Sequence, residues 1–323
     1  MAIKNEFCGV ILAAGTGQRI KPLSFYEPKP ILPICNKPIV QYQIDDMKQL
    51  GIREYFIIVG GPLKDNIKKY FGDGSSQGIK ITYVEQKNPL GIAHAVSILE
   101  EYIDRPFFVF LGDIFLVPRN LTRMLEIFKN QKTGAVLAVK KEKDSESIKR
   151  NFAVIFSEKN EVKKVIEKPR YIHNEYKGCG IYLFDLQIFD AIRNTPRTAM
   201  RDEYEITTSI QILLNGGASV YAAEVVDWDM NVTFPEDVLL CNQKQLKQLG
   251  KKEIIGENVK ISKGTNIRNS VIGDKVEIVN PIKIIDSVIF SGATVNSEID
   301  LEHCLVTPKL TMDFKRKVIY EVI

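Results

Sequence analysis

The chain has 323 residues, enough for two domains, and its 45% hydrophobic and 26% charged residues are typical of a globular protein. The net charge of +4 gives no indication of a nucleic acid or a membrane surface as partner. No apolar run approaches the ~18 residues of a membrane span. Five scattered cysteines without C-x-x-C spacing favour a reduced, cytoplasmic protein.

The first 140 residues alternate between apolar strands and amphipathic helices. Strands are expected at 9–13, 55–59, 79–84, 107–111 and 135–139, and helices at 39–50, 64–71, 93–102 and 121–129. This alternation predicts an α/β fold with a Rossmann-like, mostly parallel sheet flanked by helices. Ligands of such sheets bind at the carboxyl ends of the strands.

A glycine-rich loop follows the first strand, which ends at Ala13. Gly15 and Gly17 can adopt positive φ and bring backbone N–H groups close to an anion. Arg19 would add a planar fork, and Lys29, between two prolines, a point charge. We interpret this stretch as a site for nucleotide phosphates; the alternative is a tight turn without function.

From residue 152 the pattern changes to shorter strands. They are expected at 152–156, 162–167, 180–184 and 219–225, with helices at 186–193, 204–214 and 235–249. We expect these segments to complete the same sheet, so that residues 1–250 form a catalytic domain.

Residues 251–323 form the second predicted domain and contain an internal repeat. Three copies of 17 residues align without gaps at 256–272, 273–289 and 290–306. The columns of aliphatic residues are Ile261/Ile278/Val295, Ile267/Ile284/Leu301 and Ile272/Ile289/Val306. Apolar positions about six residues apart predict a short parallel β-helix, with an antiparallel meander as the alternative. Its open ends favour a homo-oligomer, and the tail 307–323 would cap one end.

The string A-A-G-x-G-x-R-x-x-P-L-S followed by P-K-P-x-x-P (residues 13–33) resembles the signature of the sugar-1-phosphate nucleotidylyltransferases. These enzymes join a nucleoside triphosphate to a sugar 1-phosphate. The resemblance covers about 7–249, and more loosely 254–306. It implies the nucleotide-diphospho-sugar transferase fold, a β-helix that is left-handed, and Mg²⁺ as cofactor.

The resemblance assigns substrate-binding roles to Ala13, Ala14, Gly15 and Gly17. We expect Arg19 to hold the β- and γ-phosphates, which become pyrophosphate, and Lys29 to hold the α-phosphate. The attacking phosphate oxygen is already ionised at neutral pH, so that the reaction requires no general base. The sequence shows no nucleophile–base pair.

Asp113 directly follows a predicted strand, within a G-D pair that holds Mg²⁺ in the family. Without the resemblance it would be interpreted as a helix N-cap. The string WDMNVTFPEDVLL places Asn231 at the family's second metal ligand, with Asp229 as the alternative.

The segment VEQKNPLGIAHAV resembles the family's base-reading segment and implies nucleotide binding by Gln86, Pro89 and Gly91. Ile92 stands where the family usually has threonine, which removes a hydroxyl from this segment.

The E-K-P element implies that Glu167 binds sugar hydroxyls and Lys168 the sugar phosphate, with Gly180 on the same side. Two departures concern this side: Phe152–Ala153 replaces the usual Y-G, and Gly178 replaces an asparagine. The identity of the sugar therefore does not follow from the resemblance.

The A-A-G loop and Asn231 favour dTTP or UTP, with glucose 1-phosphate as the default sugar. The NKPI segment (residues 36–39) and the β-helix keep a GTP-dependent mannose-1-phosphate guanylyltransferase open as an alternative.

Two further alternatives are a non-catalytic subunit that binds nucleotide sugars and a bifunctional enzyme with an acyltransferase β-helix. Retention of Arg19, Lys29, Asp113 and Lys168 argues against the first. Three coils without a long inserted loop argue against the second, and His303 is interpreted as structural.

Overall fold

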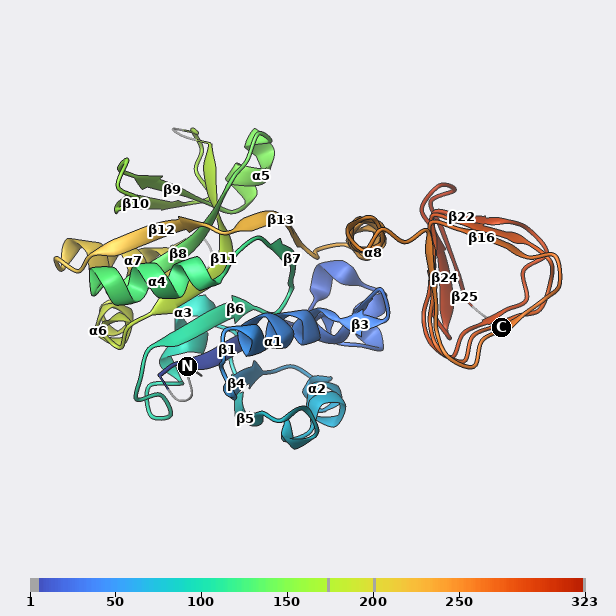
Figure 1. Cartoon of the computed structure of the whole chain (residues 1–323), viewed down its shortest axis with the longest axis horizontal. Helices are drawn as coiled ribbons and strands as arrows, with labels where there is room; N and C mark the ends of the chain where they lie inside the picture. Colours follow the sequence, from blue (N-terminus) through green and yellow to red (C-terminus); the bar gives the residue numbers. More distant parts are fainter. Residues whose placement is uncertain (1–5, 173–174, 200–201, 322–323) are drawn as a thin grey trace. The chain divides into compact units, whose positions relative to one another are not determined.

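The structure is a computed structural model that describes residues 6–172, 175–199 and 202–321. By its internal packing the chain forms two units (Figure 1). Unit 1 comprises residues 1–16 and 43–229, and unit 2 comprises 17–42 and 230–323. The boundary expected near residue 250 divides the chain linearly, whereas packing groups 17–42 and 230–249 with the C-terminal region.

Unit 1 is built on a nine-stranded sheet with the order β10-β9-β11-β6-β1-β4-β5, in which β8 pairs with both β11 and β12. The strands are β1 (Cys8–Ala13), β4 (Glu54–Val59), β5 (Lys80–Glu85), β6 (Phe107–Leu111), β8 (Ala135–Lys141), β9 (Phe152–Phe156), β10 (Val162–Glu167), β11 (Tyr176–Phe184) and β12 (Val220–Glu224). Strands β1, β4, β5 and β6 run parallel, as do β8 and β12. The expected parallel sheet is thus present around β1, while β11 is antiparallel to β6, β8 and β9.

Helices cover both faces of this sheet. They are α1 (Ile39–Gln49, which spans the two units), α2 (Lys64–Phe71), α3 (Ile92–Ser97), α4 (Thr122–Gln131), α5 (Ser145–Arg150), α6 (Gln187–Arg193) and α7 (Ile206–Asn215). Helices α3, α6 and α7 share one core cluster with β1, β6 and β8. Helix α4 packs against β8 and β12, and its buried residues lie outside that cluster, so it covers the opposite face. This is the flanked sheet that the alternating pattern predicts.

Two strands that the sequence did not predict form a small separate sheet. Strand β7 (Ile114–Pro118) pairs with β13 (Val226–Asn231). The sequence of β13, VDWDMN, alternates apolar and polar residues, a strand signal that sequence reasoning missed, whereas β7 is a continuous apolar run that follows β6 after only two residues. Strand propensity depends on the packing surroundings, which local sequence does not contain.

Unit 2 contains α8 (Pro235–Gln248), the hairpin β2 (Pro33–Ile34) and β3 (Lys37–Pro38), and three 3-10 turns. The turns are η1 (Gln18–Ile20), η2 (Leu23–Phe25) and η3 (Lys29–Ile31). The rest is a region of short strands, residues 253–306, here named the coil stack.

In the coil stack, the strands lie on three parallel sheets. They are β14 (Glu253–Ile255), β15 (Lys260–Ile261), β16 (Asn266–Arg268), β17 (Ser270–Ile272), β18 (Glu277–Ile278), β19 (Lys283–Ile285), β20 (Val288–Ile289), β21 (Thr294–Val295), β22 (Leu301–Glu302) and β23 (Cys304–Val306). Each strand pairs in parallel with the one 17 residues further on, as Ile267 with Ile284 and Ile284 with Leu301. The period and its three aliphatic columns are thus confirmed, and the antiparallel meander is wrong. The arrangement is consistent with the predicted parallel β-helix.

The tail extends one of these sheets. Strands β24 (Leu310–Asp313) and β25 (Val318–Glu321) are antiparallel and continue from β23. The tail therefore covers the edge of the last strand on one side of the stack, in the manner that relieves an open strand edge.

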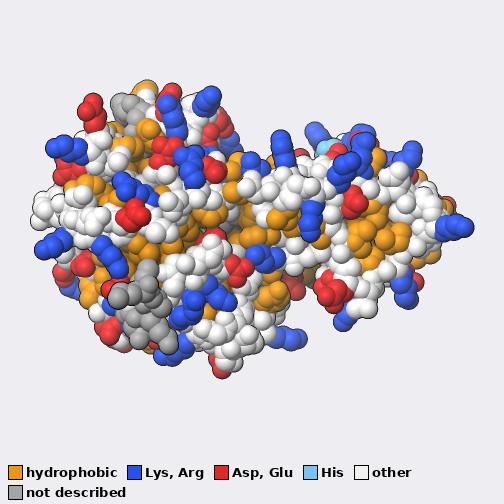
Figure 2. Space-filling view, viewed as in Figure 1, with side chains coloured by type: hydrophobic (Ala, Val, Ile, Leu, Met, Phe, Trp, Pro, Cys, Tyr) orange, Lys and Arg blue, Asp and Glu red, His pale blue; other side chains and the backbone are white. Residues whose placement is uncertain are grey.

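Lys and Arg side chains are interspersed with Asp and Glu over the face seen in Figure 2. Among the described residues, no helix has the length and apolar character that crossing a membrane requires.

Substitution of an inward column residue tests the coil stack. Ile284 is fully buried in the core of the stack. Ile284→Ala is expected to lower the free energy of unfolding by about 2–5 kcal/mol because it leaves a cavity among aliphatic neighbours. The matched control is Ile299→Ala, since Ile299 is 54% exposed, and its cost should stay within about 0.5 kcal/mol. Equal losses in urea unfolding would contradict the inward assignment.

Candidate active site

The register of the sheet in unit 1 brings several predicted residues to one edge. Ala13 pairs with Val59, and Val59 pairs with Glu85, the residue before Gln86. The N–H of Gln86 donates to the carbonyl of Val59 over 2.9 Å, and the N–H of Gly112 donates to that of Leu12 over 2.9 Å. The carboxyl ends of β1, β4, β5 and β6 therefore lie together, with Ala13, Gln86 and Asp113 at this edge.

Gly60, which sequence reasoning missed, allows a close approach between the segments that follow β1 and β5 at this edge. A Cβ at Gly60 would lie 2.9 Å from both the Ala14 Cβ and the Gln86 carbonyl oxygen, so a larger residue would separate them. A Cβ at Gly15, by contrast, would meet no heavy atom of the described chain within 4 Å. The signal for Gly60 was available, because it follows β4 as Gly15 follows β1.

The side-chain amide of Gln86 has a fixed orientation. Its Nε2 donates to the carbonyl of Gly91 over 3.3 Å and lies 2.9 Å from Nδ1 of His94. Both N–H groups are thereby used, so only the amide oxygen of Gln86 remains for a ligand. Gly91 adopts φ +105°, and a Cβ there would lie 2.5 Å from the carbonyl oxygen of Tyr204. Pro89, the third residue predicted in this segment, is exposed on the loop before α3.

His94 can accept the hydrogen bond from Gln86 only while its Nδ1 carries no proton. Burial lowers the pKa of His94 below its ordinary value of 6.5, which favours the neutral imidazole. Sequence reasoning did not select His94, because a lone histidine carries no information about its neighbours in the fold.

On the sugar side of the prediction, Glu167 ends β10, and its Oε2 accepts from the Thr207 hydroxyl over 3.2 Å. Lys168 follows with φ +42°, a conformation that few non-glycine residues adopt and that often marks functional sites. Its N–H donates to the carbonyl of Asn151 over 2.8 Å. Its ammonium lies 4.0 Å from Glu167 Oε1. The strand end is thus held in one conformation with both charges side by side.

The two departures from the family pattern, at Phe152 and Gly178, lie next to each other in the fold. A Cβ at Gly178 would lie 1.8 Å from Cζ of Phe152, so the phenyl ring takes the room of any side chain there. The ring stacks on Tyr182 at 6.0 Å between centroids. Gly180, at φ +69°, lies in an irregularity of β11 between Gly178 and Tyr182. An aromatic surface therefore replaces the expected amide.

A buried ion-pair network occupies Asp229, the alternative metal ligand. The Lys177 ammonium lies 2.8 Å from Asp229 Oδ2, and the Lys140 ammonium lies 3.1 Å from Oδ1. Lys140 also pairs with Glu142 at 3.0 Å. Burial alone would lower the pKa of Lys140, but the carboxylates of Asp229 and Glu142 together outweigh the effect of burial and raise the pKa. Asp229 thus joins β13 to β8 and β11. The two lysines were missed because lysine normally indicates an exposed position.

The remaining predicted residues belong to unit 2. Gly17 adopts φ +63° beside Ser24, where a Cβ would lie 3.1 Å from the serine Cβ. Arg19 is exposed on η1. Lys29 begins η3 and is only 9% exposed, flanked by Pro28 and Pro30. Asn231 is exposed at the end of β13.

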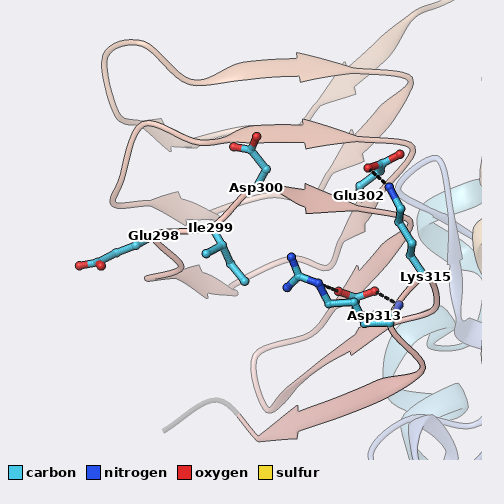
Figure 3. A pocket seen from close by; sticks show the side chains of 7 residues that line it. Glu298, Ile299, Asp300, Glu302, Asp313 and Lys315 are labelled. Atoms are coloured by element: carbon cyan, nitrogen blue, oxygen red, sulfur yellow. Dashed lines mark hydrogen bonds and ion pairs between the residues drawn. The ribbon is translucent and has the colours of Figure 1, made fainter.

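The described residues contain no group of three His, Cys, Asp or Glu side chains placed to hold a metal ion. A hollow of about 420 Å³ lies on the coil stack and tail, and none of the predicted residues lines it (Figure 3). Its lining residues are Glu298, Ile299, Asp300, Glu302, Asp313, Lys315 and Arg316. Two carboxylates there pair with Lys315 and Arg316.

Parallel strands with a glycine-rich loop at their carboxyl edge define a nucleotide-binding type of α/β protein. Residues 8–232 match the family described as nucleotidyl transferase. The chain belongs to this family.

Two similar proteins come from Haloferax volcanii. The low-salt glycan biosynthesis nucleotidyltransferase Agl11 is 34% identical over 256 residues, which cover 78% of this chain and 70% of Agl11. The UTP–glucose-1-phosphate uridylyltransferase AglF is 31% identical over 228 residues, which cover 71% of this chain and 92% of AglF.

Two solved structures share the fold. A candidate glucose-1-phosphate thymidylyltransferase from Bacillus anthracis, in complex with sucrose, has a TM-score of 0.66 and 27% identity, and the match covers 73% of this chain and 94% of that one. A UDP-glucose pyrophosphorylase with bound UDP-glucose has a TM-score of 0.65 and 21% identity, covering 74% and 98%.

Replacement of Asp229 tests the buried network. Asp229→Asn leaves two largely buried ammonium groups without their shared carboxylate, and should cost about 3–5 kcal/mol in urea unfolding. Asp227, on the same strand, pairs with Arg119 at 2.6 Å but is 48% exposed. The control Asp227→Asn should therefore cost less than about 1 kcal/mol. Similar costs for the two variants would show that the network contributes no more than a surface pair.

The neutral state of His94 predicts a pH dependence of stability. Because the folded-state pKa is lowered from 6.5, the contribution of His94 is fully present above 6.5 and is lost as pH falls through the folded-state pKa. His94→Asn keeps an acceptor for Gln86 but cannot titrate. The loss of stability on moving from about pH 7 to pH 5 should be smaller in this variant than in the wild type. Parallel stability curves for the two proteins would contradict the assignment.

Proposed function

We propose that this chain is a Mg²⁺-dependent sugar-1-phosphate nucleotidylyltransferase. The observation that carries the proposal is the common carboxyl edge of β1, β4, β5 and β6 in a member of the nucleotidyl transferase family, since the strands of this edge are followed by the glycine-rich loop, by Gln86 and by Asp113. The glucose-1-phosphate activities for which AglF and the Bacillus anthracis protein are named support glucose 1-phosphate as the sugar substrate.

In the proposed reaction, an oxygen of the sugar phosphate attacks the α-phosphorus of the nucleoside triphosphate. An O–Pα bond forms, the bond from Pα to the bridging oxygen breaks, and its electron pair leaves with pyrophosphate. Since the nucleophile is already ionised, catalysis consists of positioning and charge stabilisation. Lys29 would stabilise the α-phosphate, Arg19 the pyrophosphate, and Lys168 the sugar phosphate.

The metal ligands we propose are Asp113 and Asn231. Carboxylate and amide oxygens suit Mg²⁺, which needs few protein ligands when substrate phosphates complete its coordination. Mg²⁺ would supply charge neutralisation at the phosphates. Asp229 is a poor choice, because each of its oxygens faces a lysine ammonium.

The orientation of Gln86 favours a base with an N–H on its pairing edge. Only the amide oxygen of Gln86 is left, and it can accept from N3–H of uracil or thymine, whereas cytosine presents an acceptor at that position. We therefore propose dTTP or UTP as donor. Guanine also carries an N–H at the corresponding position, so GTP with mannose 1-phosphate is the alternative to be tested.

We also propose a homo-oligomer formed through the coil stack, which we infer to be a left-handed β-helix.

Pyrophosphate release tests the proposal directly. The protein is incubated with Mg²⁺, each nucleoside triphosphate in turn and a panel of sugar 1-phosphates. Asp113→Ala and Lys29→Ala should each reduce kcat by about 10²–10³-fold, because they remove groups that stabilise charge in the transition state.

The matched control is Asp104→Ala, at the opposite end of β6, where the side chain is 83% exposed. It should keep full activity. A wild type that releases no pyrophosphate with any substrate pair contradicts the enzyme assignment, and binding of a nucleotide sugar without turnover would favour the non-catalytic subunit. Full activity of Asp113→Ala would overturn the metal assignment.

A further inference from the structure

The hairpin that follows Lys29 has a turn under backbone strain. Strands β2 and β3 are joined by Cys35 and Asn36, with φ of +48° and +62°. A two-residue hairpin turn with positive φ at both positions is favourable for asparagine and glycine but not for cysteine. A conformation of this kind persists when its surroundings hold it.

Helix α8 provides one part of these surroundings. Asn242 is 1% exposed, and its Oδ1 accepts from the N–H of Cys35 over 2.7 Å. Its Nδ2 donates to the carbonyl of Pro33 over 3.2 Å and to that of Val238 over 2.8 Å. One buried side chain thus fixes both ends of β2 to the helix.

The coil stack provides the other part. Nδ2 of Asn36 donates to the carbonyl of Ile272 over 2.8 Å, at the end of β17. Cys35 packs into a cluster of Leu239 and Leu246 of α8 with Val271 and Val288 of the stack. Burial raises the pKa of the Cys35 thiol to about 12, so it remains an uncharged packing group. The hairpin, α8 and the coil stack therefore share one core.

A short and stiff segment of the chain, residues 29–33, connects this core to Lys29. The N–H of Leu32 donates to the carbonyl of Lys29 over 3.0 Å, which closes η3. The next residue is Pro33, the start of β2, and prolines at 28, 30 and 33 fix φ along the path. The N–H of Ile39 returns to the carbonyl of Leu32 over 3.3 Å.

We propose that Asn36 and Asn242 are positioning residues, through which the coil stack and α8 hold the turn that carries Lys29. The inference rests on the proposed function in one respect, the contact of Lys29 with the nucleotide. The coil stack then contributes to nucleotide affinity while its residues touch no substrate.

The test uses two matched glycine variants of the full chain. Asn36→Gly removes the donor to Ile272 and keeps a residue that tolerates positive φ. Asn269 also has positive φ, at +48°, and its Nδ2 donates to Asp286 Oδ1 inside the stack. Asn269→Gly therefore removes a comparable hydrogen bond from the stack without touching the hairpin.

Two readouts separate positioning from stability. Amide hydrogen exchange of residues 29–34 should rise about 5-fold in Asn36→Gly, the effect of one lost hydrogen bond, and stay unchanged in Asn269→Gly. The KM for the nucleoside triphosphate should rise about 5-fold in Asn36→Gly, with the KM for the sugar 1-phosphate unchanged.

Unchanged exchange at residues 29–34 in Asn36→Gly would overturn the inference, as would equal rises in KM for both substrates. If Asn269→Gly gave the same increases, the effect would be one of general stability and the inference would also fail. A wild type inactive with every substrate pair would contradict the proposed function, while the exchange experiment would still show whether the stack holds the hairpin.

Discussion

The pairing of β1 with β4 and β6 is the constraint on which the arrangement of unit 1 depends. Parallel strands in register end at one edge, and the loops that follow them must share the space there. Gly60 shows how little space remains, because a single methyl group would collide with both Ala14 and the Gln86 backbone. The orientation of the Gln86 amide has a local origin, since its N–H groups are used by Gly91 in its own loop and by His94 in α3.

Sequence reasoning predicted strands and helices correctly where the periodic spacing of apolar residues indicates which side chains are buried. The strands at Phe107–Leu111, Phe152–Phe156 and Val162–Glu167 and the helix at Lys64–Phe71 have the predicted bounds. The 17-residue repeat predicted the three aliphatic columns of the coil stack, because stacking of coils requires the same residue type at each level. Helix α3 was predicted too long, since 98–102 keep an apolar pattern in a turn that follows the helix.

The sequence could not reveal features made by residues far apart in the chain. Lys140, Lys177 and Asp229 are each polar residues in strands, and only the fold brings them together in a buried network. Asn242 looks like an ordinary helix residue, yet its amide satisfies the strained turn of a hairpin more than 200 positions earlier. Phe152 and Gly178 read as two unrelated departures from a family pattern, but the ring of one fills the place of the other's side chain.

A reaction without acid–base chemistry depends on charged groups in fixed positions, and the backbone that carries those groups determines their positions. If charge placement is the source of catalysis, then what fixes a lysine matters as much as the lysine itself. Lys29 is largely buried between prolines, in a turn that continues into a hairpin anchored by Asn242 and Asn36. A long, flexible cation on a mobile loop would lose entropy each time a phosphate bound, whereas a turn fixed to a folded core has lost it during folding. Under the proposed function, the packing of residues 17–42 with α8 and the coil stack would therefore hold Lys29 in place before a phosphate binds.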